Sequence, residues 1–253
     1  MTIEIPASRL ARLRSINWML GLLHAAQGVV VLALGNGFAL PVTGSFMAGP
    51  PGSGLVTTRT LFHVSFAAGV AAFLFVSAIA HLTIATPRVF RWYVAGLAGG
   101  RNYARWFEYS ISASVMVVLI AMLTGISDVA ALGAIFGVNA AMILFGLVQE
   151  RYERPGGSLT PFWLGALVGI VPWLVIGVYL ISPGVAAQPP AFVYAIYVSL
   201  FLFFNSFAVN MWLQYRKVGK WLDYVYGETV YAVLSLVAKS LLAWQVFAGT
   251  LAS

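Results

Sequence analysis

Residues 224–250 read YVYGETVYAVLSLVAKSLLAWQVFAGT, an apolar segment with one lysine, Lys239, near its middle. A helix needs about 20 predominantly apolar residues to cross the hydrocarbon core of a bilayer, so this segment predicts a transmembrane helix. Lys239 lies roughly 22 Å from the start of that helix at a rise of about 1.5 Å per residue. At this depth a lysine cannot comfortably extend its ammonium group to the membrane surface.

Six other segments have a similar length and composition. They run near residues 15–37, 60–86, 101–125, 129–149, 161–181 and 191–214, and are separated by proline, glycine and charged residues. No segment shows the alternating pattern of a transmembrane barrel strand over ten residues. We therefore expect an all-α membrane protein, a bundle of seven transmembrane helices that forms a single domain over residues 1–253.

The composition supports a membrane protein. The chain is 61% hydrophobic and 8% charged and has no cysteine, whereas a soluble domain has roughly a quarter of its residues charged. This composition excludes ordinary soluble enzymes, disordered tails and disulfide-rich secreted modules. The net charge of +7 could suggest a nucleic-acid partner. The cations are too dispersed for a basic patch, so we expect no nucleic acid and take the lipid bilayer as the partner.

The positions of the cations predict the orientation in the membrane. If seven helices alternate in direction, twelve of the fourteen cations fall on one face. These are Arg9, Arg12, Arg14, Arg88, Arg91, Arg101, Arg105, Arg151, Arg154, Arg216, Lys217 and Lys220. The positive-inside rule then places the N-terminus in the cytoplasm and the C-terminus outside. We expect an integral, multi-pass protein of the cell membrane.

Two details concern the N-terminal part of the chain. A basic and then apolar start could indicate a signal peptide, but the apolar stretch up to Leu34 is long for one, which favours a retained first helix. The outer connection, residues 38–58, is rich in glycine and proline. Residues 40–43 and 55–58 in it could pair as a short β-hairpin.

Among the charged residues within the predicted helices, two stand out, Lys239 and Glu108. A charge within the bilayer is costly, so each suggests a function. One interpretation is a structural ion pair that locks two helices together. The other is that the lysine amine carries a carbonyl cofactor as a Schiff base, because burial favours the neutral, nucleophilic amine. Glu108, which we take as the only well-buried acid, would be the counterion, although helix rise places it roughly 10 Å closer to the cytoplasm.

The surroundings of both residues carry a resemblance to a known family. Residues 105–110, RWFEYS, and residues 235–240, SLVAKS, followed by Ala243-Trp244-Gln245, resemble the helix 3 and helix 7 signatures of the heliorhodopsins. These are microbial-type retinal rhodopsins with inverted membrane topology, and the resemblance covers the full chain. It implies all-trans retinal in the dark as a Schiff base on Lys239, with Glu108 as the sole counterion.

Polar residues on four predicted helices lie at one depth, roughly 8–15 Å from the cytoplasmic ends. They are His24, Ser77, His81, Glu108 and Asn139. The pattern indicates a hydrated cavity, and the resemblance implies a proton-accepting cavity that contains histidine, which His24 and His81 match. Each histidine could instead make an ordinary hydrogen bond between helices. A zinc site is a weak alternative, because no third ligand has suitable spacing.

A retinal pocket needs aromatic rings around the polyene and small residues that make room. Our candidates are Trp106, Tyr109, Asn139, Met142, Trp173, Phe203, Phe204 and Phe207, although each ring could serve only to pack the bundle. Ser235, one turn before Lys239, should hydrogen-bond at the Schiff base.

The expected function is that of a photoreceptor. A proton pump of this architecture has an acid one turn before the lysine and another eleven residues after the first acid, where this chain has Ser235 and Leu119. We therefore expect photoisomerisation with local proton transfer, no vectorial pumping, no enzymatic activity, and sensory or regulatory signalling to a cytoplasmic partner. The alternatives are a light-driven ion transporter or channel of the same fold, and a seven-helix membrane enzyme that uses Glu108, His24 and His81.

Other features concern contacts between helices and the cytoplasmic face. Gly133 with Gly137, and Gly165 with Gly169, allow close helix packing, either within the bundle or in a homodimer. The resemblance implies a homodimer through the helices at 129–149 and 161–181. We expect a solvated charged loop of Glu150, Arg151, Glu153 and Arg154, which could dock a partner. Glu228 should either cap its helix or interact with Arg105.

Overall fold

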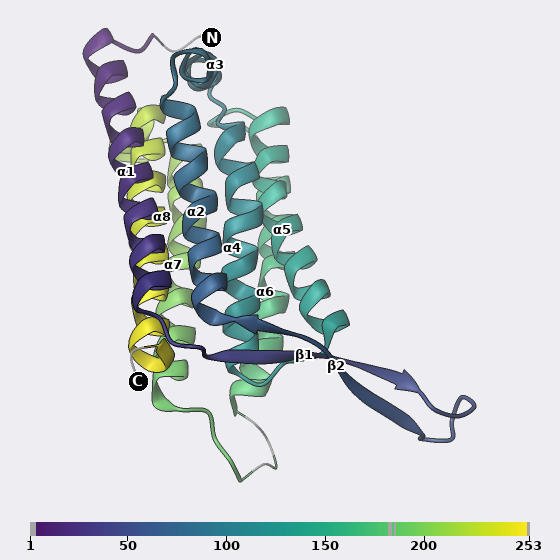
Figure 1. The fold of residues 1–253 in the computed structure, drawn as a ribbon. Coiled ribbons are helices and arrows are strands. Elements are labelled where there is room, and N and C mark those ends of the chain that lie inside the picture. Colours follow the sequence, from purple (N-terminus) through teal and green to yellow (C-terminus); the bar gives the residue numbers. More distant parts are fainter. Residues whose placement is uncertain (1–3, 182–183, 185, 252–253) are drawn as a thin grey trace.

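The computed structural model describes residues 4–181, 184 and 186–251, and seven long helices dominate it (Figure 1). They are α1 (Ala7–Leu34), α2 (Phe66–Ala85), α4 (Tyr103–Leu123), α5 (Val129–Tyr152), α6 (Thr160–Ile181), α7 (Ala191–Tyr215) and α8 (Tyr224–Val246). Each is long and apolar enough to cross a membrane. The predicted all-α, seven-helix membrane fold is confirmed.

The outer surface of the bundle is apolar. Leu167, Val178 and Leu202, for example, each expose more than half of their surface. A soluble monomer seldom exposes so large a contiguous apolar surface, whereas lipid covers such a surface without cost. The outward-facing residues therefore support the assignment of this chain as an integral membrane protein.

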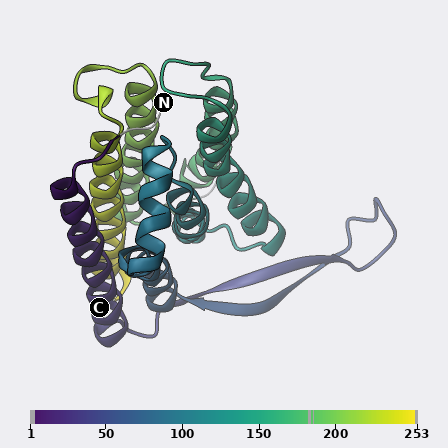
Figure 2. The same cartoon turned by 90° about the horizontal axis from the view of Figure 1, so that it is seen from above.

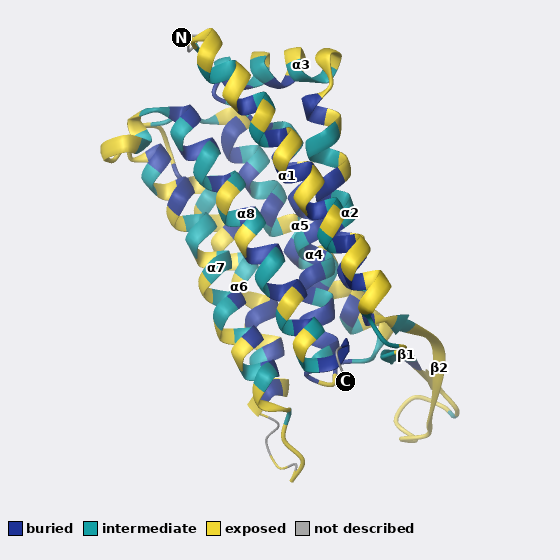
Figure 3. Ribbon diagram, turned by 60° about the vertical axis from the view of Figure 1, so that its left-hand side comes forward, coloured by how far each residue is buried: buried dark blue, intermediate teal, exposed yellow. Residues whose placement is uncertain are grey.

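The two ends of the bundle differ. The N-terminus and a short helix, α3 (Pro87–Ala98), lie at one end, which we call the α3 end, and the C-terminus and a β-hairpin lie at the other, the hairpin end (Figures 1 and 3). The sequence reasoning missed α3. It lies across the bundle, buries Tyr93 and Leu97, and exposes Trp92. Pro87 is at the start of α3, where a missing N–H costs nothing, and Gly100 (φ +68°) turns the chain into α4.

The β-hairpin pairs β1 (Ala39–Met47) with β2 (Val56–Ser65) in antiparallel register and projects sideways from the bundle (Figure 2). Its strands are longer than the four-residue strands expected. Residues 60–65, expected in the second transmembrane helix, belong to β2, and α2 begins at Phe66. The β-branched residues of this segment favour a strand. Midway along β1, the Thr43 backbone N–H donates to the Ser127 carbonyl at 2.8 Å, which ties the hairpin to the α4–α5 connection.

Candidate functional site

Lys239 of α8 and Glu108 of α4 meet inside the bundle. Lys239 Nζ lies 3.0 Å from Glu108 Oε1, and both side chains are buried. Lys239 Nζ also donates to Ser235 Oγ at 2.7 Å, and Ser77 Oγ of α2 donates to Glu108 Oε1 at 2.6 Å. Four side chains from three helices thus form one buried polar group.

The gap expected between Lys239 and Glu108 closes because the two helices begin at different levels. Asn102 caps α4, and its Nδ2 donates to Glu228 Oε2, one turn into α8. Counted from this shared level, Lys239 lies only five residues further along than Glu108, or roughly 7.5 Å at about 1.5 Å per residue. Side chains on a helix lean toward its N-terminus, so the lysine stem covers this difference.

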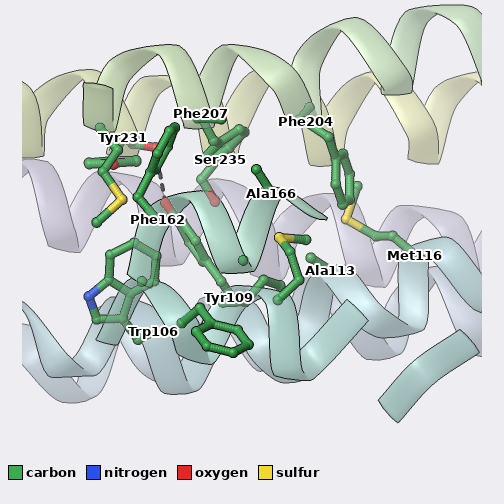
Figure 4. A pocket seen from close by; sticks show the side chains of 18 of the residues that line it. Trp106, Tyr109, Ala113, Met116, Phe162, Ala166, Phe204, Phe207, Tyr231 and Ser235 are labelled. Atoms are coloured by element: carbon green, nitrogen blue, oxygen red, sulfur yellow. Dashed lines mark hydrogen bonds between the residues drawn. The ribbon is translucent and has the colours of Figure 1, made fainter. Parts of the chain in front are cut away.

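An apolar cavity extends from Lys239 between α4, α5, α6, α7 and α8. Figure 4 shows Trp106 and Tyr109 opposite Tyr231 and Phe207 in this cavity. The other residues that line it are Ala113, Met116, Met142, Ile143, Phe145, Gly146, Phe162, Gly165, Ala166, Phe204, Ala208, Met211, Ser235, Ala238 and Lys239. We call this the ring cavity. Its lining combines rings, small residues and one amine, which fits a long apolar molecule with a terminal carbonyl.

The structure brings most of the predicted pocket residues to the ring cavity. Trp106, Tyr109, Met142, Phe204, Phe207 and Ser235 line it, as does Lys239. Asn139, Trp173 and Phe203 do not. Asn139 Nδ2 donates to Ser114 Oγ at 3.0 Å, and the Trp173 ring packs edge-on against Tyr197, Phe201 and Phe204. Asn139 lies one turn from Ile143, and Trp173 lies two turns from Ala166. Both therefore share the lining face of their helix but lie at a different level along it, which the sequence did not reveal.

Tyr231 and Phe162 line the ring cavity and were missed. Tyr231 was open to prediction, because it lies one turn before Ser235 and two turns before Lys239 on the same face of α8. Phe162 lies in the first turn of α6, where position alone does not distinguish a pocket residue from an interfacial one.

Four of the five predicted polar residues lie level with the lysine or on its α3 side, namely His24, Ser77, His81 and Glu108. His81 Nδ1 lies 2.8 Å from Asn17 Oδ1, and the rings of His81 and His24 stack with centroids 5.9 Å apart. His24 is fully buried, and neither ring nitrogen hydrogen-bonds to a described residue. A second cavity, the polar cavity, is lined by Asn17, His81, Tyr93, Asn102, Arg105, Glu108, Tyr109, Glu228, Thr229 and Tyr231 with apolar neighbours. Of the five residues predicted for a hydrated cavity, His81 and Glu108 line it, whereas His24, Ser77 and Asn139 do not.

The expectation that Glu108 is the only well-buried acid is wrong. Glu150 and Glu228 are also buried, and both form ion pairs with Arg105, which confirms the interaction expected between Glu228 and Arg105. The expectation that Glu150 lies in a solvated loop is also wrong. Helix α5 continues to Tyr152, so Glu150 turns into the bundle while Arg151 remains exposed.

The described part of the chain contains no group of three histidine, cysteine, aspartate or glutamate side chains that could hold a metal ion. The chemistry this site supports is that of an amine and a carboxylate. Lys239 can form a covalent bond to a carbonyl group at the end of the ring cavity. Glu108 can balance a positive charge on the resulting nitrogen, and the polar cavity offers groups that can take a proton from it.

Comparison with known proteins gives a family match for this chain. The family model described as Heliorhodopsin matches residues 13–251, nearly the whole chain. No curated protein matches the sequence.

Proposed function

The chain belongs to the heliorhodopsin family of retinal-binding, light-sensing membrane proteins, and from this premise we propose that it is a photoreceptor with retinal bound to Lys239 as a Schiff base. The observation that carries the proposal is the 3.0 Å contact between Lys239 Nζ and Glu108 Oε1 at the end of the ring cavity. Glu108 is the proposed counterion, because a buried cation requires a nearby carboxylate.

When bound, retinal supplies absorption of visible light and isomerisation of a double bond. The chain supplies the surroundings. Trp106, Tyr109, Phe207 and Tyr231 exclude water and confine the chromophore, and Ser235 and Glu108 hold the proton at Nζ. The ring cavity follows α4 from Trp106 to Met116, roughly 15 Å of helix at about 1.5 Å per residue. This elongated form supports an extended, all-trans chromophore in the dark.

We further propose that light moves a proton locally, without vectorial transport. Among the described buried residues, the acids, the arginine and His24 lie level with Lys239 or toward the α3 end. On the hairpin side, the buried polar residues are Ser112, Ser114, Thr124, Asn139 and Thr250, which do not relay protons as carboxylates do. The region of Glu108, His81 and His24 is the proposed proton acceptor, with Ser77 as part of its hydrogen-bonding network.

The signal would pass through the α3 end, which we propose faces the cytoplasm and contacts a signalling partner. We also propose a homodimer through α5 and α6. The two glycine pairs differ in this respect. Gly165 and Gly169 pack against Phe145 and Met142 inside the bundle, whereas a Cβ atom added at Gly133 or Gly137 of α5 would meet nothing within 4 Å. The free stripe on α5 can accept a second copy.

Retinal reconstitution tests the site. The purified protein supplied with all-trans retinal should develop a visible absorption band, and Lys239→Ala should abolish it. Ser240→Ala, the adjacent position on α8, is the matched control and should keep the band. Glu108→Gln should shift the band to longer wavelength, because the carboxylate no longer stabilises positive charge at the nitrogen. A visible band that survives in Lys239→Ala would refute the Schiff-base assignment.

Illuminated vesicles test the absence of pumping. A pH electrode should record no sustained proton flux, since the described residues on the hairpin side of Lys239 include no buried ionisable side chain that could relay a proton. A flux abolished by an uncoupler would instead support the light-driven transporter of the same fold.

A further inference from the structure

Arg105, Glu150 and Glu228 form a buried charged cluster at the α3 end that the proposed photochemistry does not use. Arg105 Nη1 pairs with Glu228 Oε1, and Nη2 pairs with Glu150 Oε1. The guanidinium lies over the rings of Trp106 and Tyr231, 4.3 and 3.8 Å from their centroids. The cluster therefore joins α4, α5 and α8, and α8 is the helix that carries Lys239.

The buried charges in the described part of the chain do not balance. The buried acids are Glu108, Glu150 and Glu228, and the buried lysine and arginine residues are Lys239 and Arg105. Lys239 balances Glu108, so Arg105 faces two carboxylates. An uncompensated charge in a low-dielectric interior is strongly unfavourable, and a carboxylate removes it by binding a proton. One of the two acids should therefore be neutral.

The hydrogen bonds distinguish the two acids. Glu150 receives four donors: Arg105 Nη2 and the Tyr224 hydroxyl on Oε1, and the Asn102 backbone N–H and Trp106 Nε1 on Oε2. Glu228 receives two, Arg105 Nη1 on Oε1 and Asn102 Nδ2 on Oε2. More donors stabilise the ionised form. Glu228 also lines the polar cavity, whereas Glu150 does not.

We propose that Glu228 is a proton-binding site that carries a proton in the resting protein and exchanges it through the polar cavity. On ionisation the O–H bond of Glu228 breaks, the proton passes to water or a base in that cavity, and a carboxylate remains beside Arg105. The titratable and charged groups around Glu228 come from every neighbouring element. They are His81 of α2, Tyr93 of α3, Arg105, Glu108 and Tyr109 of α4, Glu150 of α5, and Tyr224 and Tyr231 of α8.

The proton on Glu228 sets how strongly α8 is held to α4. With Glu228 neutral, Arg105 has one full ion pair, to α5. With Glu228 ionised, Arg105 gains a second, to α8, the helix that carries Lys239. The polar cavity also contains Glu108 and His81, so a change in their protonation alters the field at Glu228 and shifts its proton equilibrium. The influence of Glu108 and His81 on Glu228 rests on the proposed function, whereas the proposed proton on Glu228 does not.

Infrared spectroscopy of the full chain in the dark tests the site. The protein with retinal at neutral pH should show a protonated carboxylic C=O band that shifts in D2O. Glu228→Gln should remove this band. Glu150→Gln should also remove it, because Glu228 then remains as the only acid that can balance Arg105 and should ionise. Glu153→Gln, a control outside the cluster, should keep the band. Glu228→Asp keeps a carboxyl group and should shift the frequency of the band, whereas Glu150→Asp should leave the frequency nearly unchanged. This pair preserves the charge count, so it identifies which acid carries the proton, and it also serves if Glu228→Gln does not fold.

The same spectra recorded without retinal separate this proposal from the photoreceptor proposal. In that form Glu108→Gln identifies any band from the Glu108 carboxyl group, and the Glu228 band should persist. A band that persists in Glu228→Gln, a band shifted by Glu150→Asp but not by Glu228→Asp, or a wild-type protein without any protonated carboxyl group would each overturn the assignment.

Discussion

The shape of the ring cavity depends on single residues, and Gly146 of α5 is the clearest example. A Cβ atom at Gly146 would lie 2.4 Å from the Trp106 ring, closer than packed atoms tolerate. Trp106 lines the ring cavity and also donates from Nε1 to Glu150 Oε2 at 2.7 Å. The absence of a side chain at Gly146 thus lets one ring serve the chromophore site and the buried charged cluster together.

We expect Gly146→Ala to displace Trp106. The retinal band should shift, and the protein should lose about 1–3 kcal/mol of stability, the usual cost of overpacking. Gly133→Ala on the same helix is the control: within one chain a Cβ there meets nothing within 4 Å, and alanine favours a helix over glycine by about 1 kcal/mol. Because Gly133 lies on the stripe proposed for the homodimer, both variants are compared as monomers. Absorption spectra and thermal bleaching measure both effects. Equal behaviour of the two variants would contradict the packing argument.

Residues that stand out from an apolar segment could be predicted from the sequence. Residues whose role depends on how neighbouring helices pack could not. Lys239 and Glu108 were found because a charge in an apolar segment is conspicuous. Glu150 was misplaced because it adjoins Arg151 and Glu153 at a helix end, where a buried and a solvated acid look alike in sequence. Asn139 and Trp173 were assigned to the pocket from their helices alone, but the level that the cavity reaches along each helix depends on packing between helices.

At the scale of elements, the connections were predicted less well than the spans. The hydrophobic segments located all seven long helices, most of them to within a few residues. Helix α3 was missed because its 12 residues are too short to span a membrane and too polar to stand out. The hairpin was underestimated because Thr60–Ser65 is apolar enough to read as the start of α2.

The start of α5 offers a test of how one element is held. Asp128 accepts from the backbone N–H groups of Ala130 and Ala131, at 2.9 and 3.2 Å, and so caps the helix beside the point where β1 is anchored. We expect Asp128→Ala to lower the free energy of unfolding by about 1 kcal/mol, the typical contribution of such a cap. Asp128→Asn should retain most of it, since asparagine caps equally well. Denaturant unfolding followed by circular dichroism provides the comparison, and an Ala variant as stable as the wild type would contradict it.

At the scale of the whole molecule, charge is concentrated at one end. The α3 end carries twelve of the fourteen cations in or beside it, and Arg59 in β2 lies at the hairpin end. Helix insertion retains basic connections in the cytoplasm. The same end contains the Arg105 cluster and the polar cavity. The proposed orientation therefore places the proton-exchanging groups next to the cytoplasm, where a partner could respond to them.

The chain has no cysteine, so single-cysteine variants report this orientation cleanly. Ser53 lies at the tip of the hairpin and Ser8 near the start of α1, and both are exposed. We expect a membrane-impermeant thiol reagent to label Ser53→Cys in intact cells and to label Ser8→Cys only after the membrane is opened. The cysteine-free wild type controls for background. The reverse labelling would place the α3 end outside and would require the signal to be read on the other side of the membrane.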